Sequence, residues 1–438
     1  MVFKYVTHVY DSNGNNVTGY FSPEAFGIRS TSENTKQGTL NTEKTVHLSP
    51  EVNSIPLVSF DPTKLRGNVF SDPSMIWSYN RYNLASIMKI NNEQFLYKNG
   101  TLASVWPQDL AIDDDGNAYV TCNIGSITQV AQNGGPSRTV ISGITTEYQN
   151  VTPIMKFSPS GVVLGVEYVL GVVHAGHICF YKDINGKDTI AFSVYSEGIG
   201  TRNESSLPSG WDSSWTPYYR PSDTAFVSFE CIKTSGLFTS VTRNDDDIFI
   251  PSHMNTGNGK KLTMLADEVE TFGANKHVIN QSYKYDDVGK NVLLGVSITG
   301  ETPSGISYSM QNVFHFNPDS SDVSMYNRPS NIISNGNSSW GSRTLQSFYL
   351  RGAHKYLTYG SIDTGEKGAG LSVLNITKPT ANGQSVISQK DFSLDSKWKE
   401  LEGAYVDKKE QNIYVIELYT QSSYQEMRLN KYPITNLY

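Results

Sequence analysis

The stretch Leu110-Ala-Ile-Asp-Asp-Asp-Gly-Asn-Ala-Tyr-Val120 predicts two short antiparallel strands joined by a tight turn. Apolar residues lie at both ends, and the polar run from Asp113 to Asn117 lies between them. Glycine accepts a positive φ, and Asp or Asn bonds its own backbone, so such a centre reverses the chain. The stretch Met155-Lys-Phe-Ser-Pro-Ser-Gly-Val-Val-Leu164 has a similar form. Both stretches predict β-hairpins with polar turns.

A unit of this kind recurs along the chain: a short apolar strand, a polar glycine-rich connection and a second strand. Six first strands begin at residues 118, 163, 247, 292, 356 and 413, which are 45, 84, 45, 64 and 57 residues apart. A spacing of about 40 to 60 residues is typical of one propeller blade with loops of variable length. In a propeller, neighbouring sheets cover each other's apolar faces, and closure of the ring protects the sheet edges.

The sequence therefore predicts an all-β fold, a β-propeller of six or seven blades, or of five if some repeats are parts of one blade. A β-sandwich or a series of tandem β domains is the alternative. Helical periodicity is scarce, and the segment Ser396-Lys-Trp-Lys-Glu-Leu-Glu402 is the one place where a helical turn is predicted.

Residues 1–70 differ from the repeats. The segment Val6–Tyr20 predicts a hairpin, and the segment Arg29–Lys44 is polar with few apolar residues. We expect residues 1–70 to form a β hairpin and an attachment arm, and residues 71–438 to form the propeller. The alternative is a strand that closes the first or last blade, followed by a long surface loop.

The charge balance argues against nucleic acid as a partner. The 438 residues include 35 basic and 42 acidic side chains, which give a net charge of -7, so no basic surface for phosphate is evident. The start of the chain lacks a basic region followed by an apolar segment, which predicts synthesis in a cytoplasm without a signal peptide. The most apolar stretch, residues 161–178, contains Glu167 and several glycines, so it predicts paired buried strands and not a membrane span.

Three glutamates lie inside apolar strands, namely Glu167, Glu230 and Glu417. If inner strands of different blades carried them, the three carboxyl groups would converge near the propeller axis. Crowding would raise a carboxyl pKa, and a pair of carboxyl groups could hydrolyse a glycosidic bond. The alternative is ordinary strand packing with structural hydrogen bonds. No phosphate-binding, zinc-protease or nucleophile-elbow motif is present in the sequence.

Asp113 and Asp115 are candidate calcium ligands, because clustered carboxylates and carbonyls suit a hard cation. The spacing of an EF-hand loop is missing, and a solvated hairpin turn explains the same residues. No other cofactor is expected.

A segment rich in aromatic rings, Trp211-Asp-Ser-Ser-Trp-Thr-Pro-Tyr-Tyr-Arg220, is the candidate binding site. Its proline and serines predict a loop, and loops that carry many rings often form contact surfaces. Aromatic faces can cover the apolar face of a sugar, and charged groups can bond its hydroxyls or an anionic substituent. The candidate ligand-binding residues are Trp211, Asp212, Trp215, Tyr218, Tyr219 and Arg220. The alternative is a loop whose rings plug the propeller or pack between blades.

The polar N-terminal segment, the low share of charged residues, the 26 tyrosines and the degenerate repeats resemble tail and receptor-binding proteins of bacteriophages. This resemblance implies a virion component that forms a homo-oligomer, contacts other tail proteins through its N-terminal segment and binds a host cell-surface polysaccharide. Recognition is favoured over catalysis. The alternatives are a structural tail or connector protein that forms a ring or conduit, and a carbohydrate-active hydrolase or lyase with a carboxylate site at the propeller axis.

Overall fold

The computed structural model of the chain describes its strands and many of the connections between them. The described residues are 44–48, 68–97, 99–125, 138–141, 144–147, 151–170, 178–182, 185–193, 224–244, 247–249, 260–266, 278–286, 291–301, 307–316, 323–326, 344–351, 354–360, 369–375, 386–392, 398–421 and 424–437. Within these residues the chain forms 25 strands and one short helix, α1 (Arg81–Ile87). The all-β prediction is confirmed.

The first hairpin predicted from the sequence belongs to a four-stranded antiparallel sheet with the order β4-β5-β8-β9. Its strands are β4 (Val105–Ile112), β5 (Ala118–Ile124), β8 (Val151–Phe157) and β9 (Val163–Leu170). Ile112 pairs with Ala118 across the predicted turn. Gly116 has a φ of 82° in that turn, which is the left-handed region that glycine occupies without strain.

Two further sheets follow along the chain. The five-stranded sheet has the order β1-β14-β12-β11-β10, and the next sheet has the order β15-β16-β17-β18. The strands of the five-stranded sheet are β10 (Ile178–Lys182), β11 (Asp188–Ser193), β12 (Thr224–Lys233), β14 (Lys260–Ala266) and β1 (Lys44–Leu48), the last of which runs parallel to β14. Those of the next sheet are β15 (Val278–Asp286), β16 (Asn291–Glu301), β17 (Ser307–Phe316) and β18 (Val323–Tyr326).

The last large sheet has eight strands and consists of two four-stranded meanders joined by one bridge between Gly360 and Glu400. One meander contains β19 (Thr344–Arg351), β20 (His354–Gly360), β21 (Gly370–Asn375) and β22 (Val386–Asp391). The other contains β23 (Trp398–Val406), β24 (Asn412–Gln421), β25 (Tyr424–Pro433) and β2 (Ser74–Asn80). Short two-stranded pairs are formed by β3 (Lys89–Ile90) with β13 (Thr242–Arg243), and by β6 (Arg138–Ile141) with β7 (Ile144–Glu147).

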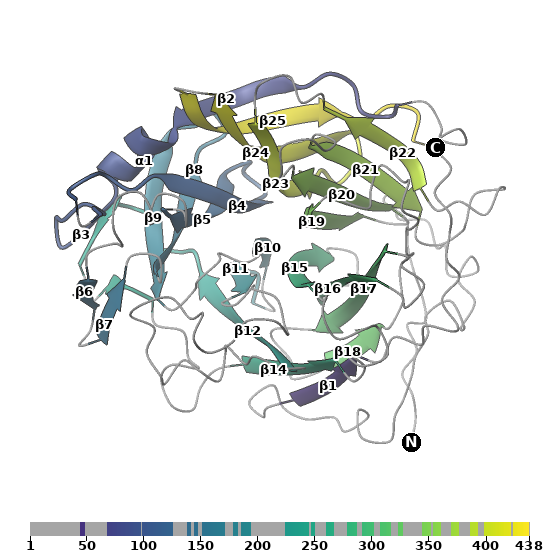
Figure 1. The fold of residues 1–438 in the computed structure, drawn as a ribbon, viewed down its shortest axis with the longest axis horizontal. Coiled ribbons are helices and arrows are strands. Elements are labelled where there is room, and N and C mark those ends of the chain that lie inside the picture. Colours follow the sequence, from purple (N-terminus) through teal and green to yellow (C-terminus); the bar gives the residue numbers. More distant parts are fainter. Residues whose placement is uncertain are drawn as a thin grey trace.

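The sheets are arranged around a centre as in a β-propeller (Figure 1). The innermost strands contact one another in a closed ring with the order β4, β10, β15, β19, β23 and back to β4. The expectation of six or seven blades was wrong: the described strands form four sheets of four strands or more, of which the eight-stranded one is double. The sequence spacing misled because long connections, such as residues 194–223, separate strands of one sheet.

The ring is closed by strand β2, which precedes the repeats in sequence and pairs with β25 near the other end of the chain. Phe70 extends this contact by forming a bridge with Ile434. Trp77 of β2 also stacks on Phe157 of β8, with 4.6 Å between the ring centroids. A segment near the start of the chain therefore holds the C-terminal meander and the first sheet together.

The hydrophobic core consists of layers between neighbouring sheets. One layer joins the first sheet to the C-terminal meander and includes Val120, Phe157, Ile416 and Leu429. Another layer, with Tyr119, Ile154, Ile190 and Phe192, joins the first sheet to the five-stranded one. Each fully buried side chain of this kind contributes about 1.5 to 3 kcal/mol. A single sheet would leave these faces exposed to water, so the packing of neighbouring sheets stabilises each of them.

Candidate functional site

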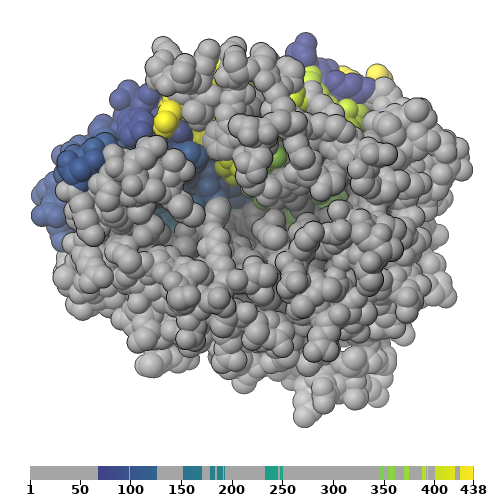
Figure 2. All heavy atoms as spheres, in the orientation of Figure 1, coloured from purple at the N-terminus to yellow at the C-terminus, as the bar shows by residue number. Residues whose placement is uncertain are grey.

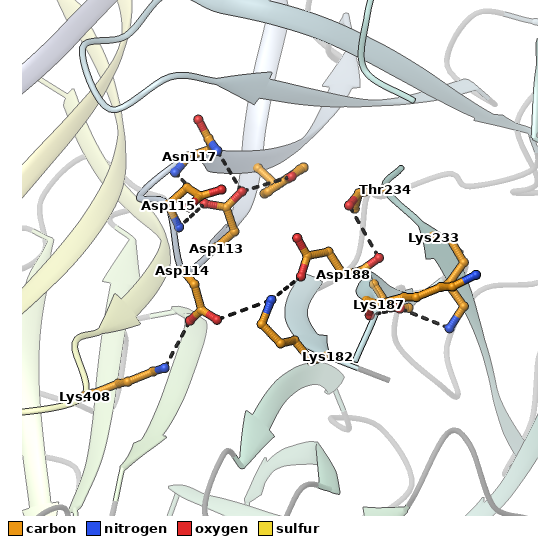
Figure 3. A network of polar contacts seen from close by, with 12 residues as sticks. Asp113, Asp114, Asp115, Asn117, Lys182, Lys187, Asp188, Lys233, Thr234 and Lys408 are labelled. Carbon is orange, nitrogen blue, oxygen red and sulfur yellow. Dashed lines mark hydrogen bonds and ion pairs between the residues drawn. The ribbon is translucent and has the colours of Figure 1, made fainter. Parts of the chain in front are cut away.

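Charged residues show in which direction the inner strands run. Asp114 follows β4, Lys182 ends β10 and Lys408 follows β23. The amine of Lys408 lies 3.0 Å from Oδ1 of Asp114, and that of Lys182 lies 3.6 Å from Oδ2 of Asp114 (Figure 3). The three inner strands therefore end at the same side of the ring. We call this side the end face and the opposite side, where β4, β10 and β23 begin, the start face.

The candidate calcium ligand Asp113 forms hydrogen bonds within its own turn. Its Oδ1 accepts the backbone N–H groups of Asp115 at 3.0 Å and Asn117 at 2.7 Å (Figure 3). Its Oδ2 accepts from the Asn117 side chain at 2.9 Å and from the Tyr119 hydroxyl at 3.2 Å. This is the bonding of an Asx turn, which reverses the chain between β4 and β5. Calcium at Asp113 and Asp115 stays a prediction; the described residues contain no group of three or more His, Cys, Asp or Glu that could hold a metal ion.

The three glutamates singled out in the sequence lie in strands, but the two described side chains have separate partners. Glu167 of β9 pairs with Arg243 and accepts the backbone N–H of Phe238 at 2.8 Å. Glu417 of β24 is buried and accepts a hydrogen bond from the Tyr432 hydroxyl. The backbone of Glu230 lies in β12, and its side chain is outside the description. Neither β9 nor β24 is an innermost strand.

The aromatic segment 211–220 falls outside the described residues, but the two strands that flank it are described. Asp188, the first residue of β11, lies 2.5 Å from Lys182 at the end face. Strand β11 therefore runs toward the start face and ends there at Ser193. Strand β12 is antiparallel to β11 and begins at Thr224. Ser193 and Thr224, the described residues that flank the connection 194–223, thus both lie at the start face.

Other acids meet at the axis, and a repeated irregularity of the inner strands brings them together. Strands β4, β19 and β23 each have a β-bulge, between Pro107 and Asp109, Leu345 and Ser347, and Leu401 and Gly403. The residues in the bulges are Gln108, Gln346 and Glu402. A bulge re-aims the neighbouring side chains, and bulges are frequent next to functional sites.

Asp109 ties three inner strands together. Its Oδ2 accepts the backbone N–H of Ile178, the first residue of β10, at 3.0 Å. Its Oδ1 accepts from the Ser347 hydroxyl of β19 at 3.1 Å. A Cβ added at Gly403 would lie 2.5 Å from Asp109 Oδ1 and from the backbone of β4. Glycine at position 403 is therefore what allows β23 to approach β4 so closely.

Two buried carboxyl groups of β23 belong to the same region, and one of them, Glu402, is close to Asp109. Glu400 accepts a hydrogen bond from the Gln346 amide. The side chains of Glu400 and Glu402 are hydrogen-bonded to each other. Burial raises the pKa of Glu402 well above its usual range, Glu400 and Asp109 raise it further, and Arg81 opposes this. Glu402 therefore keeps its proton at a pH where an exposed glutamate is ionised.

A buried cation completes the group. Arg81 begins α1, and its Nη2 donates to the Gln425 amide oxygen at 2.6 Å. Its guanidinium carbon lies 3.9 Å from the centroid of the Trp106 ring. Burial lowers the pKa of Arg81 to about 10, an effect opposed by Glu402 and Glu400 among others. We call this group of side chains near the axis the axial cluster, and its members are Arg81, Asp109, Gln346, Ser347, Glu400 and Glu402.

The axial cluster lies toward the start face, since Ile178, Glu400 and Gln425 are all near the beginning of their strands. Blue and green atoms of described segments are visible near the centre of the view in Figure 2. A carboxyl group with a raised pKa (Glu402), a carboxyl group hydrogen-bonded to an amide (Glu400) and a cation (Arg81) thus lie together near the axis. Such an arrangement can donate and accept hydrogen bonds and can transfer a proton.

The acids of the axial cluster lie in β4 and β23, and none of them is among the three glutamates singled out in the sequence. Glu400 and Glu402 belong to the segment expected to form a helical turn, and that expectation was wrong because Trp398–Val406 is strand β23. The sequence gives no strand-like signal here, because the apolar residues Trp398 and Leu401 are three positions apart, which is a helical spacing. Asp109 and Arg81 carried no signal either, since their convergence depends on the ring.

Comparisons with known proteins bear on the fold. A family model described as a β-propeller repeat matches residues 95–126, which include β4 and β5. No curated protein matches the sequence. Among the described residues, no helix has the length and apolar character needed to cross a bilayer.

Several solved structures are similar to this chain. The tail fiber of Staphylococcus aureus phage P68 is 11% identical over 86% of this chain, with a TM-score of 0.37, and the match spans 54% of the fiber, about half its length. A protein of unknown function from Dyadobacter fermentans is 9% identical over 83% of this chain and 99% of its own, with a TM-score of 0.33. An exo-1,5-alpha-L-arabinanase from a bovine ruminal metagenomic library is 10% identical over 77% of this chain and 96% of its own, with a TM-score of 0.34.

Proposed function

We propose that this chain is a virion component, part of a phage tail, that binds a host cell-surface glycan through the loops on its start face. The direction of β10, β11 and β12 supports this most directly, because it brings the described residues that flank the connection 194–223 to the start face. That connection carries Trp211, Trp215 and Arg220, whose rings and charge suit a sugar. The place in a virus tail is supported by the resemblance of the composition and repeats to tail proteins.

The aromatic segment is tested by replacing Trp211 and Trp215 together with Ala. We expect the double variant to lose binding to host cell-wall polysaccharide in a pull-down while its melting temperature stays near that of the wild type, because loop rings contribute little to a core. Lys408→Ala on the end face serves as the control and should bind as the wild type does. Undiminished binding by the double variant would contradict the assignment of this site.

The proposal also includes the assembly of this chain with copies of itself and with other proteins. As part of a tail, it would form a homo-oligomer and contact other tail proteins through residues 1–70. Light scattering of the purified chain measures the oligomer, and a strictly monomeric chain at high concentration would contradict this part of the proposal.

The axial cluster favours a second candidate, a carbohydrate-active enzyme. Glycoside hydrolysis uses one carboxyl group that holds a proton and one that is ionised. Glu402 has the raised pKa of an acid, and Asp109 is close enough to raise that pKa further. We expect Glu402→Gln and Asp109→Asn to lower the release of reducing sugar from host polysaccharide by at least about a hundredfold, if the wild type releases any. A wild-type protein that binds the polysaccharide and releases none removes this candidate.

A further inference from the structure

Residues 69–72 contact both meanders of the eight-stranded sheet, and we call this segment the strap. Val69 bonds to both meanders through its backbone. Its N–H donates to the Ser388 hydroxyl of β22 at 3.0 Å, and its carbonyl accepts the N–H of Thr435, which follows β25, at 2.8 Å. Val69 and Phe70 are buried, at 1% and 0% exposure, so the strap is part of the core.

The next two residues of the strap repeat this pattern. Phe70 forms a bridge with Ile434, which follows β25. Its ring lies edge-on to that of Tyr356 in β20, with 6.5 Å between the centroids. The N–H of Ser71 donates to the carbonyl of Pro433, the last residue of β25, at 2.9 Å. Three successive residues of the strap are therefore bound to the C-terminal meander, and the first two also contact the other one.

Lys390 of β22 holds the strap from the side of the other meander. Its ammonium lies 3.3 Å from the carbonyl oxygen of Phe70, 3.2 Å from that of Ser71 and 2.9 Å from Oδ1 of Asp72. The Asp72 side chain is 99% exposed, so water screens that ion pair. The Lys390 side chain is only 13% exposed, and its two bonds to backbone carbonyls are the stronger connection to the strap.

The strap fills the outer part of the seam between the two meanders. Nearer the axis, β20 and β23 join the meanders directly through the bridge between Gly360 and Glu400. The strap lies farther out, where it bonds to β22 on one side and to the end of β25 on the other. Phe70 belongs to the same apolar cluster as Leu371 of β21 and Val415 of β24. The strap therefore covers an apolar layer between the meanders.

We propose that the strap is a latch. While it is seated, the outer seam stays closed, and when it is withdrawn, the seam opens with the inner strands still joined. Within the described residues, the strap is bonded to β22 by two side chains, those of Ser388 and Lys390, and not by a strand ladder. A region held by few hydrogen bonds opens at a lower free energy than the whole fold.

The position of the strap in the chain gives the latch a handle. The strap continues into β2, which closes the ring, and residues 1–68 lead directly into it. A protein that holds residues 1–68 therefore acts on the seam before it acts on any other part of the ring. The latch goes beyond the proposed glycan binding and does not depend on it.

The test is native-state hydrogen exchange on the full chain, followed by mass spectrometry. The variants are Lys390→Met, which keeps an unbranched apolar side chain and removes the ammonium, and Phe70→Ala, which removes the buried ring. We expect the amides of residues 386–392 and 433–437 to exchange about tenfold to a hundredfold faster in each variant, because bonds that keep the seam closed are lost. The amides of β4 and β5 should exchange as in the wild type.

The matched control is Lys408→Met, which removes the ammonium that pairs with Asp114 at the end face and should leave exchange at the seam unchanged. If Phe70→Ala does not fold, Lys390→Met carries the test. Equal exchange at the seam in the wild type and in Lys390→Met overturns the latch. An increase of the same size in β4 and β5 overturns it as well, because the strap would then stabilise the whole ring and not the seam.

Discussion

At the scale of the residue, the axial cluster illustrates how burial changes the chemistry of a side chain. Glu402 is a common surface residue type, yet only 4% of it is exposed, and it lies beside Glu400 and Asp109. Ionising it would place a second negative charge in a medium of low dielectric constant, so its pKa rises. The same burial lowers the pKa of Arg81 to about 10.

The raised pKa of Glu402 has a consequence for stability. A carboxyl group with a higher pKa in the folded state than in the unfolded state holds its proton more tightly when folded. Its contribution to stability is therefore full below the ordinary pKa of glutamate and decreases as the pH rises from there toward the folded-state pKa. We expect Glu402→Gln, which cannot ionise, to flatten the decline in the free energy of unfolding over that pH range.

The measurement is urea unfolding at a series of pH values. Glu93→Gln, at an exposed position, is the control and should leave the pH dependence as it is in the wild type. A Glu402→Gln variant with the same pH dependence as the wild type would show that Glu402 is ionised in the folded protein.

At the scale of the element, strand β2 has a larger role than its place before the repeats suggested. It pairs with β25 over its whole length, apart from one bulge, and presents Trp77 to Phe157. From the sequence, a closing strand is predicted only as the alternative for residues 1–70. The strand that closes the ring lies just beyond that boundary, and β1, from within residues 1–70, pairs with the five-stranded sheet.

The contact between β2 and β8 predicts that substitutions at two positions of β2 differ sharply in their effect on the free energy of unfolding. Trp77 is 6% exposed, whereas Met75 is 59% exposed. We expect Trp77→Ala to lower the free energy of unfolding by about 3 to 5 kcal/mol, because it removes a large buried ring and leaves a cavity. Met75→Ala should change it by at most about 0.5 kcal/mol. Thermal or urea unfolding measures both, and similar values for the two variants would contradict the closure of the ring by Trp77.

At the scale of the whole molecule, the ring explains why the described candidate residues occur where they do. Inner strands that run in the same direction bring their bulges to one level, so Asp109, Ser347 and Gly403 become neighbours although they are far apart in sequence. The same arrangement places the hairpin turns with Asp114 and Lys408 at the opposite face. The two faces of the ring therefore have different chemistry, one with tight polar turns and one with the axial cluster and the residues that flank the connection 194–223.

The amino-acid sequence by itself determined the local structure. Polar turns such as Asp113–Asn117, between apolar stretches, specify hairpins because glycine and Asx residues reverse the chain without help from distant residues. The tertiary structure alone decided the number of sheets, the closure by β2 and the acids that share the axis. Each of these depends on which strands become innermost and where their bulges fall. That is settled by packing between residues hundreds of positions apart, and no local pattern encodes it.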